Sequence, residues 1–165
     1  MIRDTLLAKI ENHDAVVGIV GLGYVGLPLV LRFGAVGFPV IGFDVDSSKV
    51  SKLNGGQSYI GHIENERVAS LLGSGRFEAT IDFSKLADAD CVIICVPTPL
   101  NNNREPDMQY VESTASAVHK TLRAGQIVIL ESTTYPGTTR EVLLDRFQRS
   151  ELEVGEDYFL AYSPE

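Results

Sequence analysis

The sequence has no long hydrophobic run and little positive charge, and each shortage excludes a class of protein. No stretch of 18 uninterrupted apolar residues occurs, and residues 1–14 carry charges throughout, with no apolar signal core. We therefore expect no membrane span and no secretion signal, and a cytoplasmic location. Lysine and arginine number 14 against 22 acidic residues, a formal net charge of −8. Nucleic-acid binding needs a basic face, so we expect no nucleic-acid partner.

Cysteine and histidine are also scarce. The two cysteines, Cys91 and Cys95, lie in an apolar run typical of a buried strand. Four residues of extended chain separate them by about 13 Å, which excludes a disulfide within the strand. The three histidines are scattered and complete no set of metal ligands. We predict that both cysteines are core residues of the strand and that no metal is bound.

The 165 residues, 44% hydrophobic and 22% charged, suffice for one domain with a hydrophobic core. Near-continuous Val/Ile/Leu runs alternate with stretches of helical period, which is typical of parallel strands covered on both faces. The predicted strands are residues 16–20, 40–43, 77–81, 91–96, 127–130 and 158–161. The predicted helices are residues 3–12, 24–36, 48–54, 65–72, 110–122 and 139–149. The predicted fold class is α/β, a Rossmann-type doubly wound parallel sheet in a single domain.

The first predicted strand runs directly into a glycine-rich turn, GLGYVG at residues 21–26, with G-x-G-x-x-G spacing. We expect Gly21 to permit the tight turn, Gly23 to let the backbone approach a pyrophosphate, and Gly26 to let helix and strand pack closely. The N-terminus of the following helix adds N–H groups and a partial positive charge, so an acidic chain can still bind an anion. Glycines used only for packing are the alternative.

A carboxylate follows at the spacing expected for a dinucleotide site. The second predicted strand is followed by Asp44, 21 residues after Gly23. An acidic residue at this position accepts hydrogen bonds from the adenosine ribose. It would repel a 2′-phosphate about 4 Å away by on the order of a few kcal/mol, and no arginine immediately follows to offset this repulsion. The predicted cofactor is therefore NAD rather than NADP.

The sequence contains five marker segments, GLGYVGLPL, GFDVDSSKV, CVPTP, ESTTYPGTT and the terminal SPE. Together they resemble the N-terminal, NAD-binding domain of the UDP-glucose/GDP-mannose dehydrogenase family. The resemblance implies that the amides of Tyr24 and Val25 contact the pyrophosphate, that Asp44 and Lys49 hold the adenosine ribose, and that Thr98 lies beside the cofactor. For Lys49 a solvated helix position is the alternative, and for Thr98 a role in shaping the loop.

The resemblance also implies roles near the reacting end of the cofactor. Thr133 matches a threonine that binds near the cofactor and positions a catalytic water, and Glu131 ends the fifth predicted strand on the nicotinamide side. Glu165, in the terminal SPE, matches a glutamate that acts in acid–base or water-orienting chemistry. For Glu131 a structural hydrogen bond at the strand end is the alternative.

The strings SYIGHI and CVPTPLNNNREPD resemble the branch of the family that oxidises a UDP-N-acetylhexosamine at C6. The family takes the alcohol through the aldehyde to the carboxylate with two NAD, and the second oxidation runs through a cysteine thioester. We expect residues 1–165 to be the N-terminal part of such an enzyme, without its central helix and C-terminal substrate domain, and to bind NAD with negligible turnover. The parent is expected to bind the nucleotide sugar as a homodimer or higher oligomer.

Two alternatives to this interpretation stay open. A 3-hydroxyacid or 6-phosphogluconate type dehydrogenase has an N-terminal domain with a similar sheet and glycine turn, although CVPTP and ESTTYPGTT argue against it. The other alternative is a stand-alone NAD-responsive interaction module, because neither cysteine is placed to act as a nucleophile.

Overall fold

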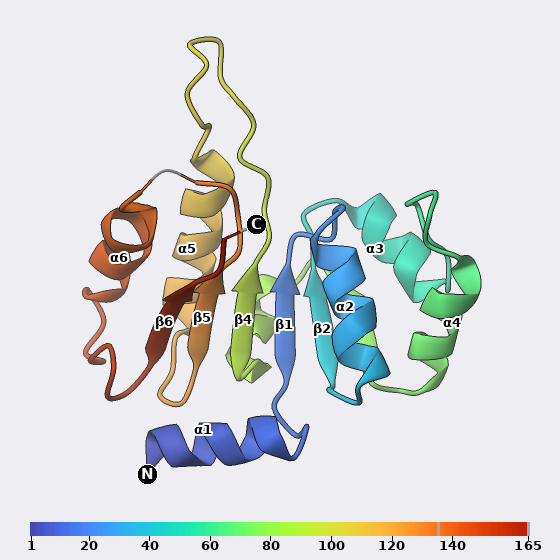
Figure 1. Ribbon diagram of the computed structural model, residues 1–165, viewed down its shortest axis with the longest axis horizontal. Coiled ribbons are helices and arrows are strands. Elements are labelled where there is room, and N and C mark those ends of the chain that lie inside the picture. Colours follow the sequence, from blue (N-terminus) through green and yellow to red (C-terminus); the bar gives the residue numbers. More distant parts are fainter. Residues whose placement is uncertain (135, 165) are drawn as a thin grey trace.

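The structure is a computed structural model that describes residues 1–134 and 136–164. In this part of the chain six strands form one parallel sheet in the order β3-β2-β1-β4-β5-β6 (Figure 1). The strands are β1 (Val17–Val20), β2 (Val40–Phe43), β3 (Phe77–Thr80), β4 (Cys91–Ile94), β5 (Ile127–Leu130) and β6 (Phe159–Tyr162). This is the strand order of the doubly wound Rossmann sheet, so the predicted fold class is confirmed.

Helices connect the strands, and every predicted helix is present. They are α1 (Ile2–Glu11), α2 (Gly26–Ala35), α3 (Ser47–Asn54), α4 (Asn65–Gly73), α5 (Gln109–Thr121), and a π-helical turn η2 (Thr139–Leu144) that continues into α6 (Asp145–Phe147). A short 3₁₀ helix, η1 (Phe83–Asp88), was not predicted, because six residues are too few to show a helical period. None of the helices in the described part of the chain is long and apolar enough to cross a membrane.

Burial of the sheet decreases from its centre toward β6. Every residue of β1, β2 and β4 is buried, whereas β5 alternates between half-buried and buried, and β6 is half-buried or exposed. Helix α2 lies over β1 and β2 on one face, and α5 lies behind β4 and β5 on the other (Figure 1). The sheet face on which α2 lies is not covered over β5 and β6 by any described helix, apart from α1 at the amino edge of the sheet. The prediction of strands covered on both faces therefore holds for the central strands only.

A buried carboxylate fixes α1 to the amino edge of the sheet. Asp90, 3% exposed, accepts hydrogen bonds from Lys9 Nζ at 2.9 Å, from Arg123 Nη2 at 3.1 Å and from the Val16 amide at 3.0 Å. Burial alone would raise the pKa of this carboxyl, but the hydrogen bonds from Val16, Lys9 and Arg123 together hold it below its usual value. The cluster joins α1, β4 and the turn before β5.

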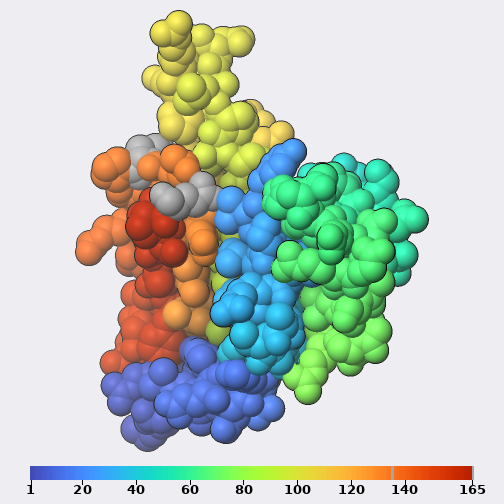
Figure 2. All heavy atoms as spheres, turned by 45° about the vertical axis from the view of Figure 1, so that its right-hand side comes forward, coloured from blue at the N-terminus to red at the C-terminus, as the bar shows by residue number. Residues whose placement is uncertain are grey.

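The loop after β4 projects from the carboxyl edge of the sheet. Leu100 and Pro106 form an isolated antiparallel bridge, and the Asn101 side chain closes the turn by accepting the Asn103 and Glu105 amides. In the space-filling view this yellow segment stands clear of the body of the molecule (Figure 2). Only its base, residues 95–98, lines the pocket described next.

Candidate functional site

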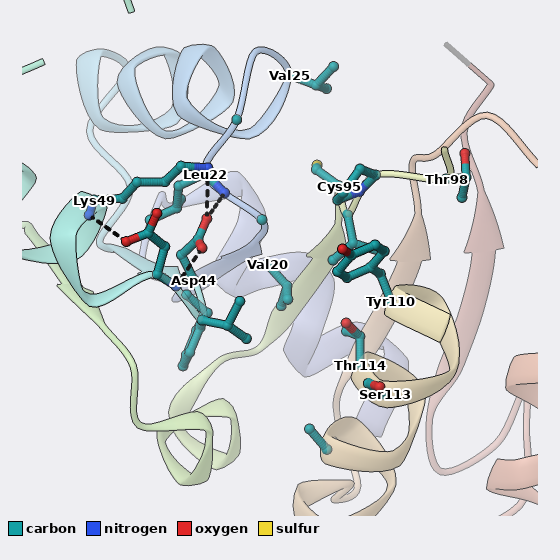
Figure 3. A pocket seen from close by; sticks show the side chains of 18 of the residues that line it. Val20, Leu22, Val25, Asp44, Lys49, Cys95, Thr98, Tyr110, Ser113 and Thr114 are labelled. Atoms are coloured by element: carbon teal, nitrogen blue, oxygen red, sulfur yellow. Dashed lines mark hydrogen bonds and ion pairs between the residues drawn. The ribbon is translucent and has the colours of Figure 1, made fainter. Parts of the chain in front are cut away.

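A pocket of about 710 Å³ opens at the carboxyl edge of the sheet, beside β1 and β4. The chain crosses to opposite faces of the sheet from these two strands, and open α/β sheets bind their ligands at such a switch point. The glycine turn and the end of β1 form one wall. Residues 43–46 and Lys49 form the second, and residues 95–98 with one face of α5 form the third (Figure 3).

The three motif glycines meet three different steric demands. Gly21 has a φ of +92°, and a Cβ there would lie 2.7 Å from the backbone oxygen of Cys95. At Gly26 a Cβ would lie 1.7 Å from the Gly21 oxygen, so only glycine lets α2 start this close to β1. At Gly23 a Cβ would meet no atom within 4 Å, which leaves room for a ligand at that position. The predicted turn and close packing are therefore present, and Gly23 is open to the pocket.

The glycine turn lines the pocket and carries backbone donors without a described acceptor. No described residue accepts a hydrogen bond from the amides of Gly23 and Tyr24. Tyr24 is 79% exposed and Val25 is half-buried, and both line the pocket. Because α2 begins directly afterwards, its N-terminal partial charge adds to these donors.

Asp44 faces the glycine turn from the end of β2. Its carboxylate, 9% exposed, accepts the Leu22 amide through Oδ2 at 2.9 Å and the Asp46 amide through Oδ1 at 2.9 Å. A carboxylate has about four acceptor positions, so capacity remains for ligand hydroxyls. Lys49 Nζ lies 3.9 Å from Asp44 Oδ2, and Figure 3 marks this ion pair with a dashed line. Lys49 thus belongs to the pocket wall. A lysine that is only a solvated helix residue would not need to lie there.

The opposite wall joins the loops that follow β4 and β5. Thr98 donates its hydroxyl to the backbone oxygen of Thr133 at 2.5 Å, and both residues line the pocket. Glu131 lies at the end of β5, where its amide bonds to the Ile94 oxygen at 2.8 Å, but it is not among the described residues that line the pocket. Glu165, predicted to act in catalysis, lies outside the described residues.

The cysteines occupy different environments, so the prediction that both are core residues of a strand was wrong for Cys95. Cys91 lies within β4 and is 8% exposed; burial, with the nearby charge of Asp90, raises the pKa of its thiol to about 11. Cys95 follows the end of β4, is half-buried and lines the pocket. The Cys95 amide still donates to the Val20 oxygen at 2.7 Å, and Pro97, two residues later, has no amide hydrogen for the ladder. The described residues contain no cluster of side chains suited to a metal ion.

Sequence reasoning missed several residues that line the pocket, and it missed Tyr59, which lies outside the lining but bonds to the glycine turn. Tyr59, from the SYIGHI string, donates its hydroxyl to the Leu22 backbone oxygen at 2.5 Å. The face of α5 that carries Tyr110, Ser113 and Ala117 lines the pocket beside Phe83 of η1. The spacing of three and four residues in α5 was the only signal in the sequence, and such spacing is typical of any helix with one buried face.

Comparisons with known proteins agree with this architecture. Residues 15–165 match the model of the UDP-glucose/GDP-mannose dehydrogenase family, NAD binding domain. UDP-N-acetyl-D-mannosamine dehydrogenase of Pyrococcus horikoshii is 34% identical over 150 residues, 90% of this chain and 36% of that protein. UDP-N-acetyl-D-glucosamine 6-dehydrogenase of Pseudomonas aeruginosa is 36% identical over 155 residues, 92% of this chain and 35% of that protein.

A solved structure gives the same result at the level of the fold. The ternary complex of GDP-mannose dehydrogenase from Pseudomonas aeruginosa superposes with a TM-score of 0.84 and 32% sequence identity. The match covers 90% of this chain and 36% of that one. The chain thus spans little more than a third of the length of the proteins that it matches.

Proposed function

The chain belongs to the UDP-glucose/GDP-mannose dehydrogenase family, and from this membership we propose that it is the NAD-binding domain of an enzyme that oxidises a UDP-N-acetylhexosamine at C6. Two relatives named for UDP-N-acetylhexosamines support the choice of sugar. The family match also favours this reading over the 3-hydroxyacid type of dehydrogenase. We propose that residues 1–165 act as one domain of this longer enzyme.

The observation that carries the proposal is the meeting of Asp44 and the glycine turn in one pocket. The open position at Gly23 and the unpaired amides of Gly23 and Tyr24 suit a diphosphate. Asp44 retains acceptor capacity for ribose hydroxyls, and Lys49 beside it can contact the same sugar. The residues present therefore fit NAD, and the charge of Asp44 disfavours a 2′-phosphate.

The remaining site residues act at the other end of the pocket. When bound, NAD supplies the acceptor for the hydride that leaves the alcohol carbon. The hydrogen bond from Thr98 to Thr133 holds the two loops together beside this end. We assign Thr133 to the positioning of a water, Glu131 to the nicotinamide side, and Glu165 to proton transfer or water orientation.

The second oxidation of the proposed reaction needs a nucleophilic thiol, and Cys91 does not suit that role. Its thiol is buried and its pKa is raised to about 11, so almost no thiolate forms at neutral pH. From membership in this family we propose that the reacting cysteine and most of the sugar pocket lie outside these 165 residues, in a longer enzyme that acts as a homodimer or larger oligomer. The chain alone should bind NAD with negligible turnover.

Calorimetric titration of the chain with NAD, and separately with NADP, tests the proposal. We expect saturable binding of one NAD per chain and weak binding of NADP. A chain that is folded by circular dichroism but binds neither dinucleotide would overturn the cofactor assignment. For the longer enzyme, UDP-N-acetylglucosamine should yield two NADH per sugar. Absence of NADH formation with all UDP-N-acetylhexosamines would contradict the proposed substrate.

A further inference from the structure

We propose that Tyr59 is a positioning residue of the dinucleotide site, which turns the amide of Gly23 toward the pocket by holding the Leu22 carbonyl on the opposite side. The inference rests on the proposed function, because it concerns how the glycine turn presents its donors. The glycine motif alone does not indicate a role for Tyr59, since Tyr59 lies 37 residues from Leu22 and outside the motif.

Leu22 is held through both of its backbone polar groups by side chains from separate segments. Its amide donates to Asp44 Oδ2 at 2.9 Å, and its carbonyl accepts the Tyr59 hydroxyl at 2.5 Å. The Leu22 side chain is fully buried in the core, and this burial is a third constraint on the residue. The turn is therefore constrained at the residue immediately before Gly23.

The planarity of the peptide group connects this constraint to the ligand. The Leu22 carbonyl and the Gly23 amide belong to one trans peptide unit, in which the C=O and N–H point in opposite directions. With the carbonyl held by Tyr59, the Gly23 amide must point away from Tyr59. Gly23 lines the pocket, and no described residue accepts from its amide. A reversed peptide would instead present a carbonyl oxygen to the diphosphate, which is electrostatically unfavourable.

Tyr59 is itself held so that its hydroxyl stays in place. Tyr59 packs against the core cluster that contains the buried Ile60 and Ile63, and the amide of the preceding Ser58 donates to Asn65 Oδ1 at 2.8 Å. Lys49 Nζ lies 5.7 Å from the centroid of the Tyr59 ring, within range of a cation–π contact.

The hydroxyl also remains a donor over the working pH range. Tyr59 is half-buried, and this burial, with the negative charges of Asp44 and Asp46, raises the pKa of its phenol well above the usual value of a tyrosine. An ionised phenolate could not donate to the Leu22 carbonyl, so the protonated form is the one that the geometry requires.

Tyr59→Phe tests the inference, because it removes the hydroxyl but keeps the ring and its contact with Lys49. Loss of one hydrogen bond should weaken NAD binding by the chain roughly threefold to tenfold. In the ligand-free chain, hydrogen exchange of the amides in residues 21–26 should become faster, while exchange in β4 and β5 stays unchanged. Tyr162→Phe, an exposed tyrosine of β6 that does not line the pocket, is the matched control and should change neither quantity.

Three outcomes separate the inference from the proposed function. If the wild-type chain binds no NAD, the proposed function fails. If the wild type binds NAD and Tyr59→Phe binds it equally well, with unchanged exchange in residues 21–26, the positioning role is wrong. A lowered thermal midpoint with unchanged NAD affinity and unchanged local exchange would also overturn it, because Tyr59 would then be a structural residue only.

Discussion

Replacing Asp44 by alanine should change both the affinity for NAD and the discrimination against NADP. The carboxylate is 9% exposed and accepts the amide of Leu22 in the glycine turn, which holds it at the pocket wall. In the wild type, we expect it to accept ribose hydroxyls of NAD through charge-assisted hydrogen bonds. Each such bond contributes about 1.5–3 kcal/mol, so NAD affinity should fall by roughly tenfold to 150-fold in the variant.

The affinity for NADP should not fall in the same variant. A 2′-phosphate about 4 Å from the carboxylate is repelled by roughly 4 kcal/mol per pair of unit charges at a near-surface dielectric. Lys49 Nζ, 3.9 Å from Asp44 Oδ2, offsets part of this repulsion. In Asp44→Ala the repulsion is gone and Lys49 is free to attract the phosphate. The affinity for NADP should therefore stay constant or rise, and the NAD:NADP affinity ratio should fall by at least about tenfold.

The assay is calorimetric titration of wild type and variant with both dinucleotides, with circular dichroism to verify folding. Asp82→Ala serves as the control, because Asp82 caps η1 through Ser84 and does not line the pocket. It should leave the NAD:NADP ratio unchanged. A folded Asp44→Ala variant with wild-type affinity for NAD, or with an unchanged ratio, would refute the assignment of Asp44 to the ribose.

Three further predictions concern the turn, the loops and the amino edge. Gly23→Ala should leave the thermal midpoint unchanged but weaken NAD binding at least about tenfold. Gly26→Ala should lower the midpoint by roughly 2–12 °C, because its Cβ would overlap the Gly21 oxygen. Equal midpoints of the two variants in differential scanning calorimetry would contradict this prediction. Thr98→Val removes the hydrogen bond to the Thr133 loop and should accelerate hydrogen exchange in residues 131–134, and unchanged exchange would count against it. Asp90 has a lowered pKa when folded, so the stability that it contributes is present above its usual pKa near 4 and is lost as the pH falls through the folded value. Asp90→Asn should cost roughly 1.5–3 kcal/mol at pH 7 in urea denaturation. The cost should decrease progressively as the pH falls below about 4, and a cost that does not depend on pH would contradict the linkage.

The predicted strands and helices agree with the structure to within a few residues wherever a segment has a strong local pattern. Apolar runs such as residues 40–43 and 127–130 form strands with the predicted bounds. The helix after the glycine turn begins at Gly26 rather than at residue 24, because the turn itself occupies the first two positions. Where the pattern is weak, as in η1, nothing in the sequence indicated the helix.

The side-chain composition of the site was predictable only in part. Asp44 was placed correctly at the end of β2, because its spacing from the turn follows from the length of one strand–helix–strand unit. The contact between Tyr59 and Leu22 could not be predicted, since it depends on how the segment between α3 and α4 folds back over the turn. The place of Cys95 in the pocket wall depended on where β4 ends, a boundary that the apolar run did not mark.

The sequence by itself determined the class of fold, the glycine turn and the acidic residue at the end of the second strand. These features depend on interactions between residues close in the chain: periodic burial, the steric freedom of glycine and the length of one unit. Only the tertiary structure decided which distant segments meet in and beside the pocket. The packing of whole elements against the sheet brings together Tyr59 with Leu22, Thr98 with Thr133, and the face of α5 with Phe83. Such contacts depend on the combined packing of many side chains, which no local pattern specifies.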